Sequence, residues 1–257
     1  MENLIITTIQ TDLFWEDTRK NLIQLEDKIR SIGTETNLIV LPEMFSTGFS
    51  MNPEKFAEKP FGHTFEWMKK QAGRCQAAVT GSYIVEEDGL YYNRLVWIEP
   101  DGRFQVYNKR HLFSLSEEPS HYAPGSRKAI ISYRGWKICP LICYDLRFPV
   151  WSRNTEDYDL LIYVANWPEK RSHHWRSLLL ARAIENQTYT VGVNRVGRDG
   201  NEFYHSGDTT ILDYSGRILS YDAHIEKITT SELSFQKQQD FRRRFPFLAD
   251  RDSFNLY

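Results

Sequence analysis

The sequence predicts an α/β protein in which β-sheets are layered between α-helices. Three observations favour this class: short apolar runs alternate with amphipathic segments, hairpins interrupt the alternation, and a Gly-Arg turn recurs in each half of the 257 residues. Two sheets packed face to face between helical layers suit this two-half pattern. A three-layer, doubly wound sheet is the alternative that the pattern leaves open.

The first quarter of the chain shows the alternation most clearly. Residues 4–9 are rich in β-branched side chains and predict a strand. Residues 15–32 place leucine and isoleucine at steps of three and four, which is typical of an amphipathic helix. Residues 38–41 are continuously apolar, as expected for a strand buried on both faces, and Pro42 ends that strand. A second helix is expected over residues 62–74.

The middle of the chain is predicted to be rich in strands, with one long loop. The expected strands cover residues 77–84, 91–98, 104–108, 128–133 and 136–142. A Pro100-Asp101-Gly102 turn joins the second and third of them. Residues 110–127 show no period and contain two prolines and a glycine, so a loop is expected there.

The alternation then resumes to about residue 212. We expect strands over residues 160–165, 188–194 and 209–212, and a helix over residues 173–186. The segment that begins at Ile211 resembles the earlier one that begins at Trp97, and each contains a Gly-Arg turn. No linker or low-complexity stretch divides the chain. One domain is therefore expected over residues 1–257.

Composition and charge exclude several functional classes. The formal net charge of -2 gives no global attraction to nucleic acid or to anionic lipid. The basic cluster Arg242 to Arg244 is expected to be a solvated or interface-facing run. No segment approaches the roughly 18 uninterrupted apolar residues of a membrane span. The start of the chain lacks a basic, then apolar, signal segment, so we expect a cytoplasmic protein.

The three cysteines, Cys75, Cys139 and Cys143, have no spacing typical of a disulfide framework or a zinc site. The paired His173 and His174 project in different directions. We therefore expect no metal and no cofactor.

Three chemically complementary side chains stand at or just past predicted strand ends: Glu43, Lys109 and Cys143. Catalytic groups gather at strand ends because the loops there hold side chains over a rigid core. A free thiol has a pKa of about 8.5 and needs a base before it can attack an amide. A carboxylate can take the proton, and a lysine cation can stabilise the oxyanion. On spacing alone, however, a small core cysteine and two solvated charges are the favoured interpretation.

The residues around these three positions favour the catalytic interpretation instead. The three segments Leu41-Pro-Glu-Met-Phe, Asn108-Lys-Arg-His-Leu-Phe and Cys143-Tyr-Asp-Leu-Arg-Phe-Pro together resemble the signature blocks of the nitrilase, or carbon–nitrogen hydrolase, superfamily. They occur in the family's order, and the resemblance extends from the first strand to about residue 220. It implies an α-β-β-α sandwich that pairs into a homodimer.

The resemblance also implies roles for individual residues. Glu43 corresponds to the general base, Lys109 to the transition-state lysine and Cys143 to the nucleophile. A second, assisting glutamate is expected at Glu118, with its neighbour Glu117 as the alternative. The backbone N–H of Tyr144 corresponds to the second oxyanion donor.

Two neighbours of the nucleophile are expected to have a structural role. Asp145 and Arg147 are expected to brace the turn at the cysteine by ion pairing rather than to touch substrate.

A further set of motifs suggests the substrate. Asn166-Trp-Pro, Arg171, His174-Trp and Ala181-Arg-Ala-Ile-Glu-Asn-Gln are similar to the omega-amidase branch. Such enzymes release ammonia from the terminal amide of 2-oxoglutaramate or 2-oxosuccinamate. Arg171 is a candidate for binding the distal carboxylate and Trp167 for walling the pocket, although Arg171 also fits a surface residue that opens the next helix.

Other functions stay open at this point. Within the family, the substrate could instead be an N-carbamoyl amino acid or deaminated glutathione. In a different class, the chain could be a non-catalytic relative or the amidase subunit of a larger assembly. The aromatic segment 235–257 lies beyond the motifs and is expected to pack on a dimer partner.

Overall fold

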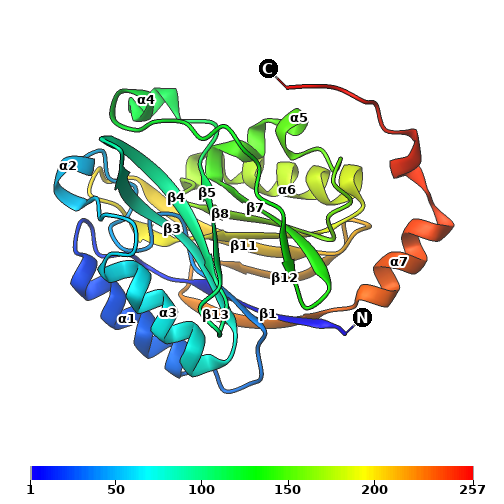
Figure 1. Cartoon of the computed structure of the whole chain (residues 1–257), viewed down its shortest axis with the longest axis horizontal. Coiled ribbons are helices and arrows are strands. Elements are labelled where there is room, and N and C mark those ends of the chain that lie inside the picture. The colour runs from blue at the N-terminus through cyan, green and yellow to red at the C-terminus, as the bar shows by residue number, and fades with distance from the viewer. Residues whose placement is uncertain (1, 257) are drawn as a thin grey trace.

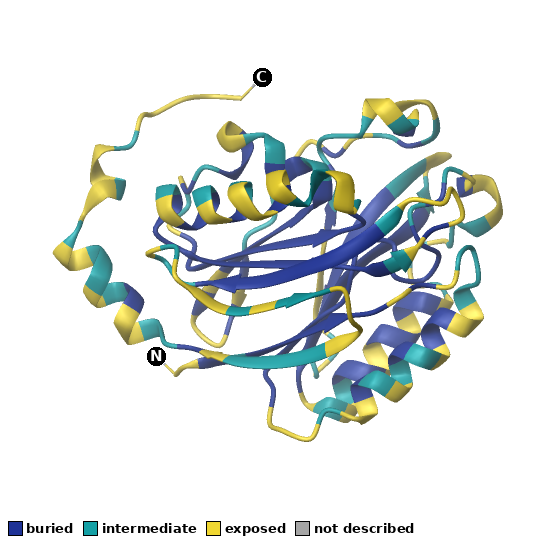
Figure 2. Ribbon diagram, turned by 180° about the vertical axis from the view of Figure 1, so that it is seen from behind, coloured by how far each residue is buried: buried dark blue, intermediate teal, exposed yellow. Residues whose placement is uncertain are grey.

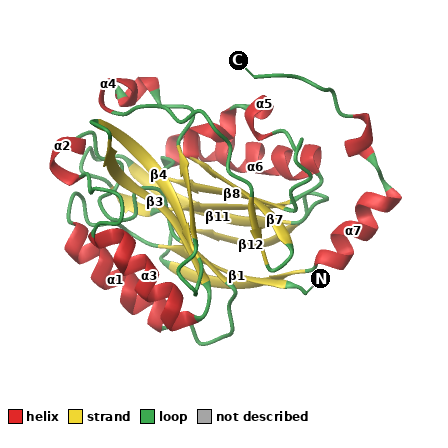
Figure 3. Ribbon diagram, in the orientation of Figure 1, coloured by secondary structure: helices red, strands yellow, loops and turns green. Residues whose placement is uncertain are grey.

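The computed structural model describes residues 2–256, which form two β-sheets packed face to face between layers of helices (Figures 1 and 3). The fold is the four-layer α-β-β-α sandwich, and the doubly wound single sheet left open by the strand pattern is wrong. Each sheet has three neighbouring parallel strands flanked by antiparallel ones.

The first sheet has the strand order β13-β1-β2-β3-β4-β5. Strands β1, β2 and β3 are parallel, and β4, β5 and β13 add antiparallel pairings. Its strands are β1 (Leu4–Gln10), β2 (Leu38–Val40), β3 (Ala78–Glu87), β4 (Leu90–Ile98), β5 (Phe104–Asn108) and β13 (Lys227–Leu233).

The second sheet has the order β10-β11-β9-β8-β7-β6, and β12 also pairs with β11. Here β7, β8 and β9 are the parallel strands. Its strands are β6 (Ile131–Tyr133), β7 (Trp136–Ile142), β8 (Leu160–Ala165), β9 (Tyr189–Asn194), β10 (Val196–Arg198), β11 (Tyr204–Leu212) and β12 (Ile218–Ala223).

Helices cover the outer face of each sheet. Helices α1 and α3 pack on the first sheet, and α6 packs on the second (Figure 1). Asp17 caps α1 by accepting a hydrogen bond from the Lys20 N–H, so the helix begins at Thr18. The α-helices are α1 (Thr18–Arg30), α2 (Pro53–Phe56), α3 (His63–Cys75), α4 (Glu118–His121), α5 (Pro149–Ser152), α6 (Ser172–Asn186) and α7 (Phe235–Arg244). Single 3₁₀ turns cover Ser114–Ser116, Cys143–Arg147, Glu169–Arg171 and Phe247–Asp250.

The core has two layers of apolar side chains that meet at the first sheet. Leu38 and Val40 point into the layer between the sheets, whereas Ile39 points toward α1 and α3. A strand buried on both faces must be apolar at every position, which explains the uninterrupted run of residues 38–41. Figure 2 shows the same result: the central strands of both sheets are dark blue, whereas the edge strands β12 and β13 are largely teal and yellow.

Three expectations were wrong in detail. Residues 110–127 are not a plain loop, because they contain a 3₁₀ turn and α4, which is too short to show a helical period. Strand β13 and helix α7 were not predicted. Within the basic cluster, Arg242 is not a solvated residue: its Nη1 lies 2.9 Å from Asp159 Oδ1, and its Nη2 donates to the Tyr158 carbonyl.

Candidate active site

The three candidate catalytic residues meet at one edge of the sandwich, where strands from both sheets end. Glu43 follows β2, Lys109 follows β5, and Cys143 follows β7. Because β2 and β5 run in the same direction through the first sheet, their carboxyl ends lie at the same edge. The second sheet supplies the cysteine from the facing layer.

The backbone is strained at two of these strand ends. Cys143 has a φ of 41° and Met44, directly after Glu43, has a φ of 42°, a region that side-chain-bearing residues seldom occupy. Ser82 in β3 holds the turn at Met44: its Oγ accepts the Met44 N–H at 2.9 Å, and its carbonyl accepts the Phe45 N–H at 3.0 Å. The strain therefore falls on Cys143 itself and on the residue that follows Glu43.

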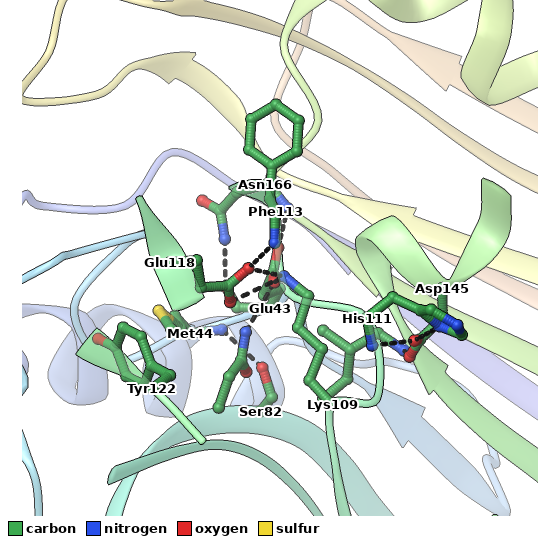
Figure 4. Close-up of polar contacts among 12 residues, drawn as sticks. Glu43, Met44, Ser82, Lys109, His111, Phe113, Glu118, Tyr122, Asp145 and Asn166 are labelled. Atoms are coloured by element: carbon green, nitrogen blue, oxygen red, sulfur yellow. Dashed lines mark hydrogen bonds and ion pairs between the residues drawn. The ribbon is translucent and has the colours of Figure 1, made fainter. Parts of the chain in front are cut away.

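Lys109 lies between two glutamates (Figure 4). Its Nζ is 3.0 Å from Glu43 Oε1, and 3.0 Å and 2.9 Å from the two carboxylate oxygens of Glu118. All three side chains are almost fully buried. The structure thus brings Glu118, rather than Glu117, to the lysine. Glu117 lies at the cavity mouth instead.

The buried charges act on one another. Burial alone disfavours the ammonium of Lys109, but the carboxylates of Glu118 and Glu43 outweigh it, so the pKa of Lys109 is raised. Burial raises the pKa of Glu118, and Lys109 opposes that effect. The cluster is therefore anchored by a lysine that keeps its proton.

The thiol of Cys143 stays protonated in this environment. Burial raises its pKa well above the ordinary value, the carboxylate of Glu43 raises it further, and Lys109 opposes both. Attack by sulfur therefore requires a base that removes the proton during the reaction, and Glu43 is the carboxylate with the strongest effect on the thiol.

Asp145 fixes the turn that carries Cys143. Its Oδ2 accepts the Ile142 N–H at 3.0 Å and the Tyr107 hydroxyl at 2.7 Å. Its Oδ1 accepts the His111 N–H at 3.0 Å. Asp145 thus braces the turn as expected, but through hydrogen bonds to β5 and the loop after it. The expectation that Arg147 braces the turn by ion pairing is wrong: within residues 2–256 it has no carboxylate partner, and its Nη2 lies 3.2 Å from His174 Nδ1.

Arg147 instead lines a cavity of about 670 Å³ above Cys143, together with Lys109, Tyr144, Trp167 and Arg171. The guanidinium of Arg147 lies 4.7 Å from the centre of the Trp167 ring, and that of Arg171 lies 5.3 Å from the Phe113 ring. Burial lowers the pKa of Arg171, and the positive charge of Arg147 lowers it further.

Within residues 2–256 neither guanidinium has a carboxylate partner. The acidic Glu117 and Asp199 also line the cavity without forming an ion pair with either guanidinium, and Arg147 instead contacts Nδ1 of His174. Two guanidiniums without a carboxylate partner favour an anionic ligand.

Trp167 and Tyr144 form walls of this cavity. The indole Nε1 of Trp167 donates to the Arg171 carbonyl at 2.8 Å, which ties the tryptophan to the turn before α6. Tyr144 packs edge-to-face on Phe113, with ring centres 5.1 Å apart. Tyr144, expected as the backbone oxyanion donor, and Trp167, expected as a pocket wall, therefore both line the cavity.

Sequence reasoning missed two asparagines at the base. Asn93 Nδ2 donates to Glu43 Oε1 at 2.8 Å, and the Asn166 N–H donates to Glu43 Oε2 at 2.8 Å. Asn166 Nδ2 also donates to the Glu43 carbonyl at 2.6 Å. Asn93 belongs to no recognised sequence motif, because it lies inside a strand. Asn166 could have been found, because it begins the Asn-Trp-Pro segment already noted.

Neither a metal site nor a membrane span is evident in the part of the chain that the structure describes. Residues 2–256 contain no group of three or more histidine, cysteine or acidic side chains arranged to hold an ion. None of their helices has the length and apolar character needed to cross a bilayer.

Comparisons with known proteins agree with this geometry. The family model for carbon-nitrogen hydrolases matches residues 5–243. The chain is 43% identical to the omega-amidase YafV of Escherichia coli K12 over the full length of both proteins. It is 33% identical to the 2-oxoglutaramate amidase of Bacillus subtilis, over 95% of this chain and 96% of that one.

Among solved structures, the carbon–nitrogen hydrolase superfamily protein XC1258 of Xanthomonas campestris superposes with a TM-score of 0.98. It is 39% identical over all of both chains, and its crystal structure contains an arsenic adduct in the active site. The fold and the overall sequence similarity thus extend over the whole length. The chain belongs to the carbon–nitrogen hydrolase family, in the branch that contains the omega-amidases.

Proposed function

We propose that this carbon–nitrogen hydrolase is an omega-amidase, which releases ammonia from the terminal amide of 2-oxoglutaramate or 2-oxosuccinamate. One observation carries the proposal: the cavity above Cys143 holds the guanidinium groups of Arg147 and Arg171 without an acidic partner. These keto acids have a carboxylate at one end and the amide at the other. The relatives named for this activity support the same substrate class.

In the first half of the proposed reaction, the thiol of Cys143 attacks the amide carbonyl while Glu43 takes the thiol proton. The negative charge that forms on the carbonyl oxygen is held by Lys109 and the Tyr144 N–H. Protonated Glu43 returns its proton to the amide nitrogen, the C–N bond breaks and ammonia leaves. A thioester on Cys143 remains.

In the second half, water attacks the thioester carbonyl, with Glu43 or Glu118 as the base. The C–S bond then breaks, the carboxylic acid leaves, and the proton returns to the sulfur. Glu118 assists in a second way, because it holds Lys109 by two short contacts. An ammonium has three N–H donors, so one donor shared by the Glu118 oxygens leaves another for the oxyanion.

Arg171 is proposed to bind the distal carboxylate of the substrate, and Trp167 to form the wall beside it. Arg147 faces the same cavity, so the two guanidiniums act together on the anion. A carboxylate between them removes their mutual repulsion, which favours the anionic substrate over a neutral amide of equal length.

We also propose a cytoplasmic homodimer. In residues 2–256 all three cysteines are free, which suits a reducing compartment. The outer face of α6 exposes Leu180 and Ile184, which are apolar residues that a partner subunit would cover.

The C-terminal segment 235–257 is proposed to extend the single domain onto that partner. Gln238 anchors its helix α7 to the chain's own body, where its Nε2 donates to the Asp159 carbonyl at 2.8 Å. Beyond α7 the chain leaves the sheets (Figure 1), and Phe247 is exposed. Light scattering of a truncation after residue 244 tests the idea, and an unchanged dimer would defeat it.

The test of the function is ammonia release from 2-oxoglutaramate by the purified protein. Cys143→Ala is the inactive variant, and Cys139→Ala is the matched control, because Cys139 is a buried cysteine outside the cavity. Turnover that survives only in the control supports the proposal. A wild type that reacts with an electrophile at Cys143 but does not turn over the keto acid refutes the substrate and keeps the nucleophile.

A further inference from the structure

The carboxylate of Glu43 is held by three donors from three parts of the chain. Lys109 Nζ and Asn93 Nδ2 both donate to Oε1, at 3.0 Å and 2.8 Å. The Asn166 N–H donates to Oε2 at 2.8 Å. A carboxylate offers about two acceptor positions on each oxygen, so Oε1 is full and one position remains, on Oε2.

We propose that Asn93 is a positioning residue for the general base: by occupying Oε1 together with Lys109, it leaves Oε2 of Glu43 as the only acceptor for the Cys143 proton. The inference rests on the proposed roles of Glu43 and Cys143. Asn93 is fully buried and does not line the cavity, so it acts through Glu43 and not on substrate.

The geometry makes Asn93 a link between the base and the lysine. While its side chain donates to Glu43, its main-chain carbonyl accepts the Lys109 N–H at 3.0 Å. Asn93 belongs to β4, between β3 and β5, so its position is set by the sheet and not by a loop. A rigid donor of this kind keeps the carboxylate from rotating when the thiol approaches.

A second asparagine holds Glu43 from the opposite sheet. Asn166, directly after β8, contacts both the carboxylate and the main-chain carbonyl of Glu43. The base is thereby clamped between the two sheets, with Asn93 on one side and Asn166 on the other. Both remaining Oδ1 atoms are buried without a partner in residues 2–256, so neither amide is held by a competing donor.

The effect of removing Asn93 depends on which of the ionisable groups that face the Glu43 carboxylate also stabilise it. They are Lys109 after β5, Glu118 of α4, Tyr122 after α4 and Cys143 after β7. Only Lys109 stabilises the carboxylate form by its charge. Asn93 holds the same carboxylate by its hydrogen bond, so its removal leaves Oε1 with Lys109 as its one remaining donor and the carboxylate less firmly placed.

The test uses Asn93→Leu, which keeps the size but loses the donor, and Asn93→Asp, which keeps the shape and adds a carboxylate. The readout is the rate of Cys143 alkylation by iodoacetamide, alongside kcat and KM for 2-oxoglutaramate. We expect each variant to lower the alkylation rate and kcat by about tenfold, because the base is misplaced, while the KM for 2-oxoglutaramate changes by less than about twofold. Thr80→Val is the control, because it removes a buried hydrogen bond from the neighbouring strand without touching Glu43.

A second measurement separates positioning from folding. In a Glu43→Gln background, Asn93→Leu should change the alkylation rate by less than about twofold, because the group through which it acts is gone. A raised KM with kcat unchanged, or an additive loss of rate in the double variant, overturns the proposal. If 2-oxoglutaramate is not a substrate, the alkylation rates still test Asn93, so the two proposals fail independently.

Discussion

The side-chain amide of Asn194 pairs with both main-chain groups of Trp167. Its Oδ1 accepts the Trp167 N–H at 2.8 Å, and its Nδ2 donates to the Trp167 carbonyl at 2.9 Å. Asn194 ends β9, one strand away from the end of β8. The pair of bonds continues the sheet by one residue and fixes the wall of the cavity beside the segment that holds Glu43.

Loss of this pairing should therefore affect both stability and substrate binding. Asn194→Leu leaves the buried N–H and carbonyl of Trp167 without partners, which costs about 2 kcal/mol in the free energy of unfolding. We also expect a higher KM, since the indole wall is no longer fixed. Urea unfolding and steady-state kinetics measure the two effects, and a KM equal to that of the wild type would dissociate Trp167 from substrate binding.

Glu43→Gln preserves the shape of the base and removes its ability to take a proton. Burial, the largest cause of the raised pKa of the Cys143 thiol, persists in the variant, so attack by sulfur still lacks a base to take the proton. We expect kcat to fall by about 10²- to 10⁴-fold, the usual contribution of a positioned base. Single-turnover kinetics with 2-oxoglutaramate measure the decrease, and near-wild-type acylation would exclude Glu43 as the base.

Lys109 is predicted to be required for stability as well as for catalysis. Lys109→Met leaves the buried carboxylates of Glu43 and Glu118 facing each other without a cation, which costs about 3–5 kcal/mol. The double variant Lys109→Met with Glu118→Gln removes one of the charges and should recover much of that loss. Chemical denaturation of both proteins decides the point, because equal stability would show that the charges do not interact.

Arg171 should distinguish anionic from neutral substrates. Arg171→Gln is expected to raise KM for 2-oxoglutaramate by about 10- to 100-fold, the range of one hydrogen-bonded charge pair. The KM for a neutral amide of similar length should change little. An equal change for both amides, or none for the keto acid, would assign the carboxylate to Arg147 or to another residue.

Cys139 gives a prediction about alkaline pH. Burial raises the pKa of this thiol to about 12, against about 8.5 in the unfolded chain. The folded state therefore binds the proton more tightly, so stability falls as pH rises from about 8.5 toward 12, by at most about 1.4 kcal/mol per pH unit. Cys139→Ala should lose stability less steeply over pH 9 to 11. Urea titrations at several pH values test this, and parallel curves would refute it.

The sequence predicted the fold well wherever the apolar residues of a segment follow one regular spacing. The run of residues 38–41 and the stripes of α1 and α3 follow directly from which faces are buried. Helix α7 was missed because its contacts are with residues distant in the chain, such as that of Arg242 with Asp159, which lies 83 residues earlier. A contact of that kind leaves no periodic trace in a single chain.

In the candidate site, too, residues within a local sequence pattern were predicted, and residues placed by distant contacts were not. Glu43, Lys109 and Cys143 were predicted from short contiguous blocks, and the geometry brings them together as expected. Asn93 and the cavity-facing position of Arg147 depend on how two sheets and their loops pack. No local pattern encodes such packing, so these residues were found only in three dimensions.

The sandwich splits the reacting groups between its two halves. Glu43 and Lys109 come from the first sheet, whereas Cys143 and Asn166 come from the second. The proposed catalysis therefore depends on the apolar layer between the two sheets, because each sheet alone lacks one of the proposed reacting partners. During refolding, turnover should appear only after the two sheets have packed together. The recovery of amide hydrolysis with time therefore reports when this last step of folding is complete.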